Sequence, residues 1–336
     1  MEFQSDKRIE AGPKTASSFG HLFAGFHIEN LFLIIAFLVM LVIFSVLSPA
    51  FLTVQNIFNV LRQCSVVLFL ASGQTMALLS GGIDLSQGSI VSLVSVISAD
   101  LMMRGYGFGI GVMGGIVTGL LCGLFTGLWV GRARLNPFIA TLGMNYIAAG
   151  IALLYTGGDS IFGLPPNCLS IMGWIGEGYF AGIPIPVILA VISLGIVYLF
   201  LNYTRLGRYI FAVGGSEEAS NVSGISIRHT RFWVYTISAG LSSIGGIILT
   251  SRCISGQPIL GGGTLLLESI GSVVIGGTSL FGGEGGILRT VLGVMIMSFG
   301  INGLNLLATS TYMQDVIVGA IIIISVWIGI MRRKQV

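Results

Sequence analysis

The sequence predicts an all-α fold, namely a polytopic bundle of transmembrane helices in which some helices are short or interrupted. Of the 336 residues, 54% are apolar and only 9% are charged, whereas a soluble globular domain carries about 25% charged residues. The chain also has 50 glycines, and Gly is frequent in membrane helices because it lets their backbones approach closely. The apolar residues gather in runs near the length of about 20 residues that a membrane helix needs.

Ten runs are long enough to be predicted as spans, with the third and eighth the weakest because they are short or rich in Gly. The polar segment 1–27 is expected to be a cytoplasmic tail. The apolar run after it is too long for the core of a signal peptide, so a retained first helix is expected. Residues 28–331 then form one transmembrane domain, with a cytoplasmic loop at 204–231 and a tail at 332–336. The spans are 28–48, 57–80, 86–103, 108–130, 137–156, 184–203, 232–251, 264–281, 286–306 and 312–331.

The basic residues orient these spans. If the N-terminus is cytoplasmic, only Arg62, Arg104 and Arg252 of the 16 basic residues fall outside, which leaves 13 inside. Cytoplasmic loops of membrane proteins carry an excess of Lys and Arg. The distribution therefore favours ten spans with both termini in the cytoplasm of a bacterial inner membrane.

The fourth span has Gly at every fourth position. At 3.6 residues per turn such a row winds slowly round the helix as a smooth groove, into which a neighbouring helix can pack closely. We expect tight packing here, and a surface that slides during a transport cycle is the alternative. The row consists of Gly111, Gly115, Gly119, Gly123, Gly127 and Gly131.

A polar stretch, Ser80 to Ser89, interrupts the apolar region between the second and third spans. Paired short segments broken by Gly indicate a substrate site in transporters. Asp84 would add a charged acceptor there, for example for a sugar hydroxyl. The alternative is that Asp84 or Ser86 simply caps the third span at its cytoplasmic end. The depth of Asp84 in the membrane decides between the two, because a carboxylate at the bilayer centre costs about 2.5–3.5 kcal/mol.

Four further polar residues within the predicted spans are candidates for the substrate pathway: Asn145, Glu268, Asn302 and Asn305. Polar residues of this kind within membrane helices more often join helices by hydrogen bonds than contact a ligand. Asn302 and Asn305 are three residues apart and share a helix face. Glu268 is ionisable and follows a loop that ends at Gly263.

The loop 204–231 contains the pattern of a short helix. Ser216 is a suitable N-cap, Glu217 and Glu218 complement the dipole of the first turn, and Gly224 is placed to end the helix. So short a helix is not stable alone. Docking on another protein would stabilise it, and a surface turn without a partner is the alternative.

Several classes of function lack their motifs. No GxxxxGK[ST] phosphate loop, HExxH motif or grouping of carboxylates with His is present, so no catalytic residue and no cofactor are assigned. The four cysteines form no CxxC pair, which argues against a metal site, and a bond between Cys168 and Cys253 stays open. The net charge of +3 comes from short clusters and argues against a nucleic-acid partner. If ATP drives transport, the ATPase must be another chain.

Four stretches resemble the membrane-spanning permease subunits of bacterial ribose-type carbohydrate ABC importers, from about residue 50 to the C-terminus. The order and spacing of the stretches match as well. The first is Ser80 to Ser86 with Gly88-Ser89, and the second is Asn136 to Gly143. The third lies in the cytoplasmic loop and consists of Arg205 to Arg208, Gly214, Glu217, Glu218, Ala219, Ser223 and Gly224-Ile225. The fourth is Ser272 to Leu280 with Gly282-Gly283.

The resemblance implies that 28–331 is a permease domain, which lies in the lipid membrane and pairs with a second permease chain, identical or not. It also implies that this pair binds two cytoplasmic ATP-binding subunits. It also implies an extracytoplasmic sugar-binding protein that delivers a monosaccharide. The helix at 216–223 would be the coupling helix. Ser216 replaces the usual Asn and keeps the capping function. Leu266 and Glu268 stand where the family usually has Glu and Asp, so the usual substrate is in question.

Other functions remain open at this point. One is an ABC permease of the same family that carries a nucleoside or a furanone-type signal. An ion-coupled carrier that works alone would need an ionisable relay, for which Asp84 and Glu268 are the candidates. A membrane-embedded enzyme would show clustered His and acidic residues on one face, and the sequence has none.

Overall fold

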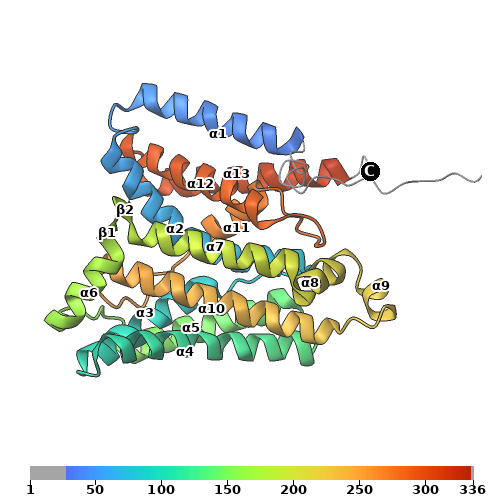
Figure 1. Ribbon diagram of the computed structural model, residues 1–336, viewed down its shortest axis with the longest axis horizontal. Coiled ribbons are helices and arrows are strands. Elements are labelled where there is room, and N and C mark those ends of the chain that lie inside the picture. Colours follow the sequence, from blue (N-terminus) through green and yellow to red (C-terminus); the bar gives the residue numbers. More distant parts are fainter. Residues whose placement is uncertain (1–27, 334–336) are drawn as a thin grey trace, which may run out of the picture.

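The computed structural model describes residues 28–333 as a bundle whose long helices lie side by side along a common axis (Figure 1). The predicted tail 1–27 and residues 334–336 lie outside the described residues. The elements are α1 (Ile28–Leu47), α2 (Val54–Leu79), α3 (Gln87–Met103), α4 (Gly107–Gly127), the π-helical turn η1 (Leu128–Arg132), α5 (Pro137–Thr156), α6 (Pro166–Glu177), β1 (Tyr179–Phe180), β2 (Ile183–Pro184), α7 (Ile185–Tyr203), α8 (Arg205–Gly215), α9 (Glu217–Val222), α10 (Ile227–Cys253), α11 (Thr264–Ile275), α12 (Ile287–Leu306) and α13 (Thr311–Arg333).

Each of the ten predicted spans corresponds to one apolar helix. Six are long and apolar enough to cross a membrane: α2, α4 with η1, α5, α7, α10 and α12. The other four, α1, α3, α11 and α13, contain shorter apolar stretches among the described residues. The prediction of an all-α polytopic membrane bundle is therefore confirmed.

Two boundaries differ from the prediction. The eighth span ends at Ile275 instead of residue 281, because Gly277 takes a left-handed conformation with φ +81° and turns the chain. At 12 residues, α11 is about 18 Å long, which is shorter than the hydrocarbon core of about 30 Å. The seventh span begins at Ile227, five residues before the predicted start, because Ser226 caps it by accepting from the His229 N–H.

The short elements gather at opposite ends of the bundle (Figure 1). We call these the α6 end, where α6 and the antiparallel β1–β2 hairpin lie, and the α9 end, where α8 and α9 lie. The connection 157–183, between the fifth and sixth predicted spans, is at the α6 end, and the predicted cytoplasmic loop 204–231 is at the α9 end. The chain thus separates the two sets of connections as the basic residues predict.

The Gly row of α4 packs tightly against α3 and α10. A Cβ on Gly119 would stand 1.9 Å from Ser243 Oγ, and a Cβ on Gly127 would stand 2.5 Å from the Phe232 carbonyl oxygen. The first distance is to a side chain and the second to backbone, so α4 lies against the Ser243 side chain at Gly119 and against the backbone of α10 at Gly127. This confirms the expected tight packing. Cys168 is buried in α6, Cys253 is exposed, and both are unpaired.

Candidate functional site

The candidate site is the place where two interrupted helices meet inside the bundle. The first interruption follows α2, which ends at Leu79 beside the α9 end. Gly81, with φ +78°, turns the chain, and residues 80–86 run back into the bundle. The Gln87 side-chain amide, at the first residue of α3, donates to the Leu70 carbonyl at 2.9 Å. Leu70 lies nine residues before the end of α2, about 14 Å along the helix axis, so α3 begins deep inside the bundle.

The second interruption enters from the opposite side. Ile254, with φ +50°, ends α10 at the α6 end. Residues 254–263 then run back along α3: the Gln257 N–H donates to Ser95 Oγ at 3.1 Å, and the Gly261 N–H donates to Ser92 Oγ at 2.9 Å. The chain then starts α11 at Thr264, inside the bundle, and proceeds to the α9 end. The segment 80–86 thus enters the bundle from the α9 end, and the segment 254–263 enters it from the α6 end.

Gly88 and Gly261 are the crossing point of the two segments. A Cβ on Gly88 would lie 2.2 Å from the Gly261 carbonyl oxygen, and a Cβ on Gly261 would lie 2.0 Å from the Gly88 carbonyl oxygen. The backbones therefore touch, and the N-termini of α3 and α11 face the interior close to one another. Helix N-termini offer unpaired N–H groups and partial positive charge. Paired discontinuous helices with such ends near the middle of the membrane are typical of transporter substrate sites.

Asp84 is held at this crossing. It is 1% exposed. Its Oδ1 accepts from the Ser86 N–H at 3.0 Å and the Ser86 hydroxyl at 2.6 Å, and its Oδ2 accepts from the Ser238 hydroxyl of α10 at 2.7 Å. The structure thus places Asp84 inside the bundle, with both oxygens bonded, and it orders the turn that starts α3. The Ser86 side chain makes no capping bond.

Replacing Asp84 by Ala should lower the stability of the chain by about 3 kcal/mol, because buried donors of Ser86 and Ser238 would lose their acceptor. Thermal unfolding of the purified chain in detergent measures this. Ser238→Ala removes one donor and keeps the carboxylate, so it should cost less. Equal stability of Asp84→Ala and the parent would contradict the ordering role.

Gln87 is a second residue of the crossing and was not among the candidates from the sequence. Its amide nitrogen also donates to Ser238 Oγ at 3.0 Å, and its carbonyl oxygen accepts from Ser269 Oγ of α11 at 3.2 Å. One buried side chain thus joins α3 to α2, α10 and α11. A Gln within a run of apolar and small residues is the only signal that could have identified it.

The amides among the candidate residues join helices. Asn145 of α5 accepts from Ser89 of α3, near the crossing. Asn302 of α12 and Asn56 of α2 bond reciprocally at 2.8 and 3.0 Å. Asn305 accepts from Gln314 of α13 at 2.7 Å. Asp84 and Asn145 thus contact the same short part of the chain, whereas Asn302 and Asn305 lie near the α6 end of α12.

Glu268 is different, because it has no hydrogen-bond or ion-pair partner among the described residues. It is 9% exposed, on the second turn of α11. Two other buried side chains without partners among the described residues lie on α2 and α11: Gln74 and Ser272. The interface of α2 and α11 therefore holds unused hydrogen-bonding capacity.

The predicted short helix at the α9 end is present as α9. The Ser216 hydroxyl accepts from the Ala219 N–H at 3.2 Å, and Gly224 has φ +77° at the end of the helix, as the sequence predicts. Glu217 pairs with Arg231 of α10. Glu218 and Ser223 are exposed. A cavity of about 580 Å³ lies between α9, η1 and α10, lined by charged side chains including Arg134, Glu218 and Arg228.

Val222 is a residue of α9 that was not among the candidates from the sequence. It is 89% exposed at the end of the helix, and Ala219 beside it is exposed as well. A single exposed apolar residue is common on protein surfaces, so it is the place of Val222 at the end of α9 that makes it a candidate contact. Its signal in the sequence was weak, because a single Val in a polar loop is common.

Comparison with known proteins identifies the family. Residues 56–326 match the family model described as branched-chain amino acid transport system / permease component. The chain is 40% identical to the ribose import permease protein RbsC of Escherichia coli (strain K12), over 90% of this chain and 93% of the relative. It is 41% identical to RbsC of Bacillus subtilis (strain 168), over 88% and 91%, and 35% identical to the D-allose transport system permease protein AlsC of Escherichia coli (strain K12), over 97% and 98%.

No solved structure matches the chain. The relatives match over nearly their full lengths, in agreement with the ten apolar helices and the four stretches that the sequence shares with the family. The chain therefore belongs to the family of membrane-spanning permease subunits of bacterial ribose-type carbohydrate ABC importers.

Proposed function

We propose that this chain forms the path by which a monosaccharide crosses the membrane in an ABC importer. Relatives named as ribose, D-allose and L-arabinose permeases support a sugar as the solute. The observation that carries the proposal is the crossing of the two interrupted helices, which places two helix N-termini in the interior of the bundle. Neutral sugars both donate and accept hydrogen bonds, so they suit a site made of backbone ends and polar side chains.

Glu268 is the pathway residue that we place closest to the solute. It is the acidic candidate with no protein partner among the described residues, whereas both oxygens of Asp84 are bonded. A carboxylate could accept hydrogen bonds from two sugar hydroxyls. The same comparison argues against an ion-coupled carrier. Such a carrier needs a series of ionisable groups that pass the ion on, and both oxygens of Asp84 already accept hydrogen bonds from Ser86 and Ser238.

The partners follow from this function. The chain pairs with a second permease chain. A cytoplasmic ATPase binds and hydrolyses the ATP, and α9 transmits its conformational change to the permease. An extracytoplasmic binding protein delivers the sugar at the α6 end. Both termini are then cytoplasmic. The chain itself acts as no enzyme and binds no cofactor.

Reconstitution tests the proposal. The permease, its ATPase and its binding protein are placed in vesicles, and uptake of labelled ribose, allose and arabinose is measured with and without ATP. ATP-dependent uptake that an uncoupler leaves unchanged is expected. Uptake by the chain alone that the uncoupler abolishes would instead identify an ion-coupled carrier.

Replacing Glu268 by Met should separate stability from transport. Burial of a polar group without a partner costs about 1–3 kcal/mol, so Glu268→Met should raise the thermal stability while it reduces sugar uptake. Thermal unfolding and vesicle uptake measure the two effects. Asn302→Leu is the control, because Asn302 already has a partner and its loss should lower stability. Unchanged uptake by Glu268→Met would remove Glu268 from the pathway.

A further inference from the structure

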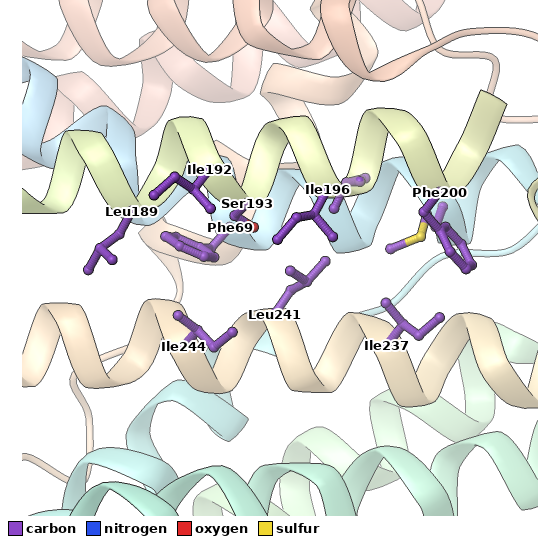
Figure 2. A pocket seen from close by; sticks show the side chains of 11 residues that line it. Phe69, Leu189, Ile192, Ser193, Ile196, Phe200, Ile237, Leu241 and Ile244 are labelled. Carbon is purple, nitrogen blue, oxygen red and sulfur yellow. The ribbon is translucent and has the colours of Figure 1, made fainter. Parts of the chain in front are cut away.

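An apolar groove lies on the side of the bundle between α7 and α10. These two helices both pack against α2 but hardly against each other. Figure 2 shows side chains of both helices pointing into the space between them. The groove has a volume of about 340 Å³, and Ser193 is the single polar residue among the eleven that line it. Buried side chains of α2, Phe69 and Met76, form its floor.

The groove opens to the surface of the bundle that faces the membrane. Ile192 and Ile196 of α7 are 54% and 63% exposed, and Ile244 of α10 is 37% exposed. Its length along α7, from Leu189 to Phe200, is about 16 Å at the helical rise. One half of a hydrocarbon core of about 30 Å is about 15 Å. The groove is thus about as long as one leaflet is thick, but it is centred on α7: four residues of that helix precede Leu189, and three follow Phe200, which marks the end nearer the α9 end.

Positive charge lies beyond that end of the groove. Helix α8 follows α7 directly and packs against α7, α10 and α2, the three helices that form the groove. Arg205 and Arg208, in its first turn, are exposed, and no acidic residue lies in that turn. Trp233 is on the same face of α10 as Ile237, one turn nearer the α9 end, and is 37% exposed. Trp is enriched at the level of lipid headgroups.

We propose that this groove binds an anionic phospholipid of the leaflet at the α9 end, with an acyl chain between α7 and α10 and the phosphate beside Arg205 and Arg208. The apolar lining suits a hydrocarbon chain, the length of the groove suits an acyl chain that enters from the α9 end and reaches past the middle of α7, and the basic pair selects a negative headgroup. Assigning that leaflet to the cytoplasmic side rests on the orientation proposed above.

The test measures lipid retained by the complex of the permease and its ATPase in mild detergent, by native mass spectrometry and by titration of phosphatidylglycerol. Three variants are compared with the parent. Arg205→Gln with Arg208→Gln removes the charge, Ser193→Trp fills the groove, and Val191→Trp puts the same ring on an exposed part of α7 outside the groove.

The parent and Val191→Trp should retain phosphatidylglycerol in preference to phosphatidylethanolamine. Each basic residue near the surface contributes about fivefold to the binding of anionic lipid, so the double variant should bind phosphatidylglycerol about 30-fold more weakly. Ser193→Trp should lose both lipids from the groove. Assembly with the ATPase shows that each variant is folded, and the Arg variant tests the proposal even if Ser193→Trp fails to assemble.

Three results would overturn the proposal. One is equal retention of phosphatidylglycerol by the double Arg variant and the parent. Another is equal retention of both lipids by the parent. The third is a disulfide between two chains that carry Ser193→Cys and Cys253→Ser in the membrane, because a second copy of the chain would then occupy the groove. Failure of sugar uptake in any of these proteins bears on the proposed function and leaves the lipid measurement unaffected.

Discussion

Replacing Val222 by Asp is expected to abolish ATP-driven sugar uptake while the permease stays folded. Val222 is 89% exposed, so the change costs the isolated chain little. In an interface with the ATPase, the same change would bury an unpaired carboxylate at a central apolar contact. Burial of an unpaired carboxylate costs about 2 kcal/mol or more, which is about 30-fold in affinity. Co-purification of the ATPase and ATP-dependent uptake in vesicles measure the effect.

Two controls make this result specific to docking. Val222→Thr keeps the shape of the side chain and should retain most of the uptake. Deletion of 216–223 removes α9 entirely and should abolish uptake at least as completely as Val222→Asp. The coupling role of α9 would be disproved if the deleted chain still imported sugar at the rate of the parent.

Replacing Gly261 by Val is expected to prevent the native packing of α3 and α11. The Cβ alone would stand 2.0 Å from the Gly88 carbonyl oxygen, and that oxygen belongs to backbone held by the buried bonds of Gln87. Overpacking of this kind costs about 3 kcal/mol at the upper end of its usual range. Yield of the folded chain, thermal unfolding and protease sensitivity in membranes measure the loss.

The matched controls come from α5. A Cβ added to Gly143 or Gly150 of that helix would meet no atom within 4 Å, so Gly143→Ala should leave stability unchanged or raise it by up to about 1 kcal/mol through helix propensity. Gly88→Ala should resemble Gly261→Val, because its Cβ would meet the Gly261 oxygen at 2.2 Å. Normal stability of both crossing variants would contradict backbone contact at this point.

The number and order of the apolar helices could be predicted from the sequence because hydrocarbon length and basic residues constrain both strongly. The cap and the final Gly of α9 could be predicted as well, since Ser216 and Gly224 act through local backbone bonds. The predicted end of α11 lies six residues too late. Gly276-Gly277 is followed by Thr278 and Ser279, a composition typical of a turn, and the span length expected for a membrane helix led the prediction past it.

The crossing itself was only half predictable. The stretch from Ser80 to Ser89 carries enough Gly and polar residues to indicate an interruption. The segment 254–263 has the composition of an ordinary loop, and its partners Ser92 and Ser95 are more than 150 positions away in sequence. The depth of Asp84 likewise depends on Ser238 of α10. Long-range pairing of this kind leaves no periodic signal in a single sequence.

The crossing also has a consequence for the order in which the protein is made. The N-terminal helices of a chain enter the membrane first, as it is synthesised. The polar groups in and before the first turns of α3, however, bond to Ser238, Gly261 and Ser269, all from the last third of the chain. Asp84 and Gln87 therefore lie in the membrane without these partners until α10 and α11 have been synthesised and inserted. We expect the first half of this permease to depend on insertion chaperones or quality control for longer than its apolar composition alone would suggest.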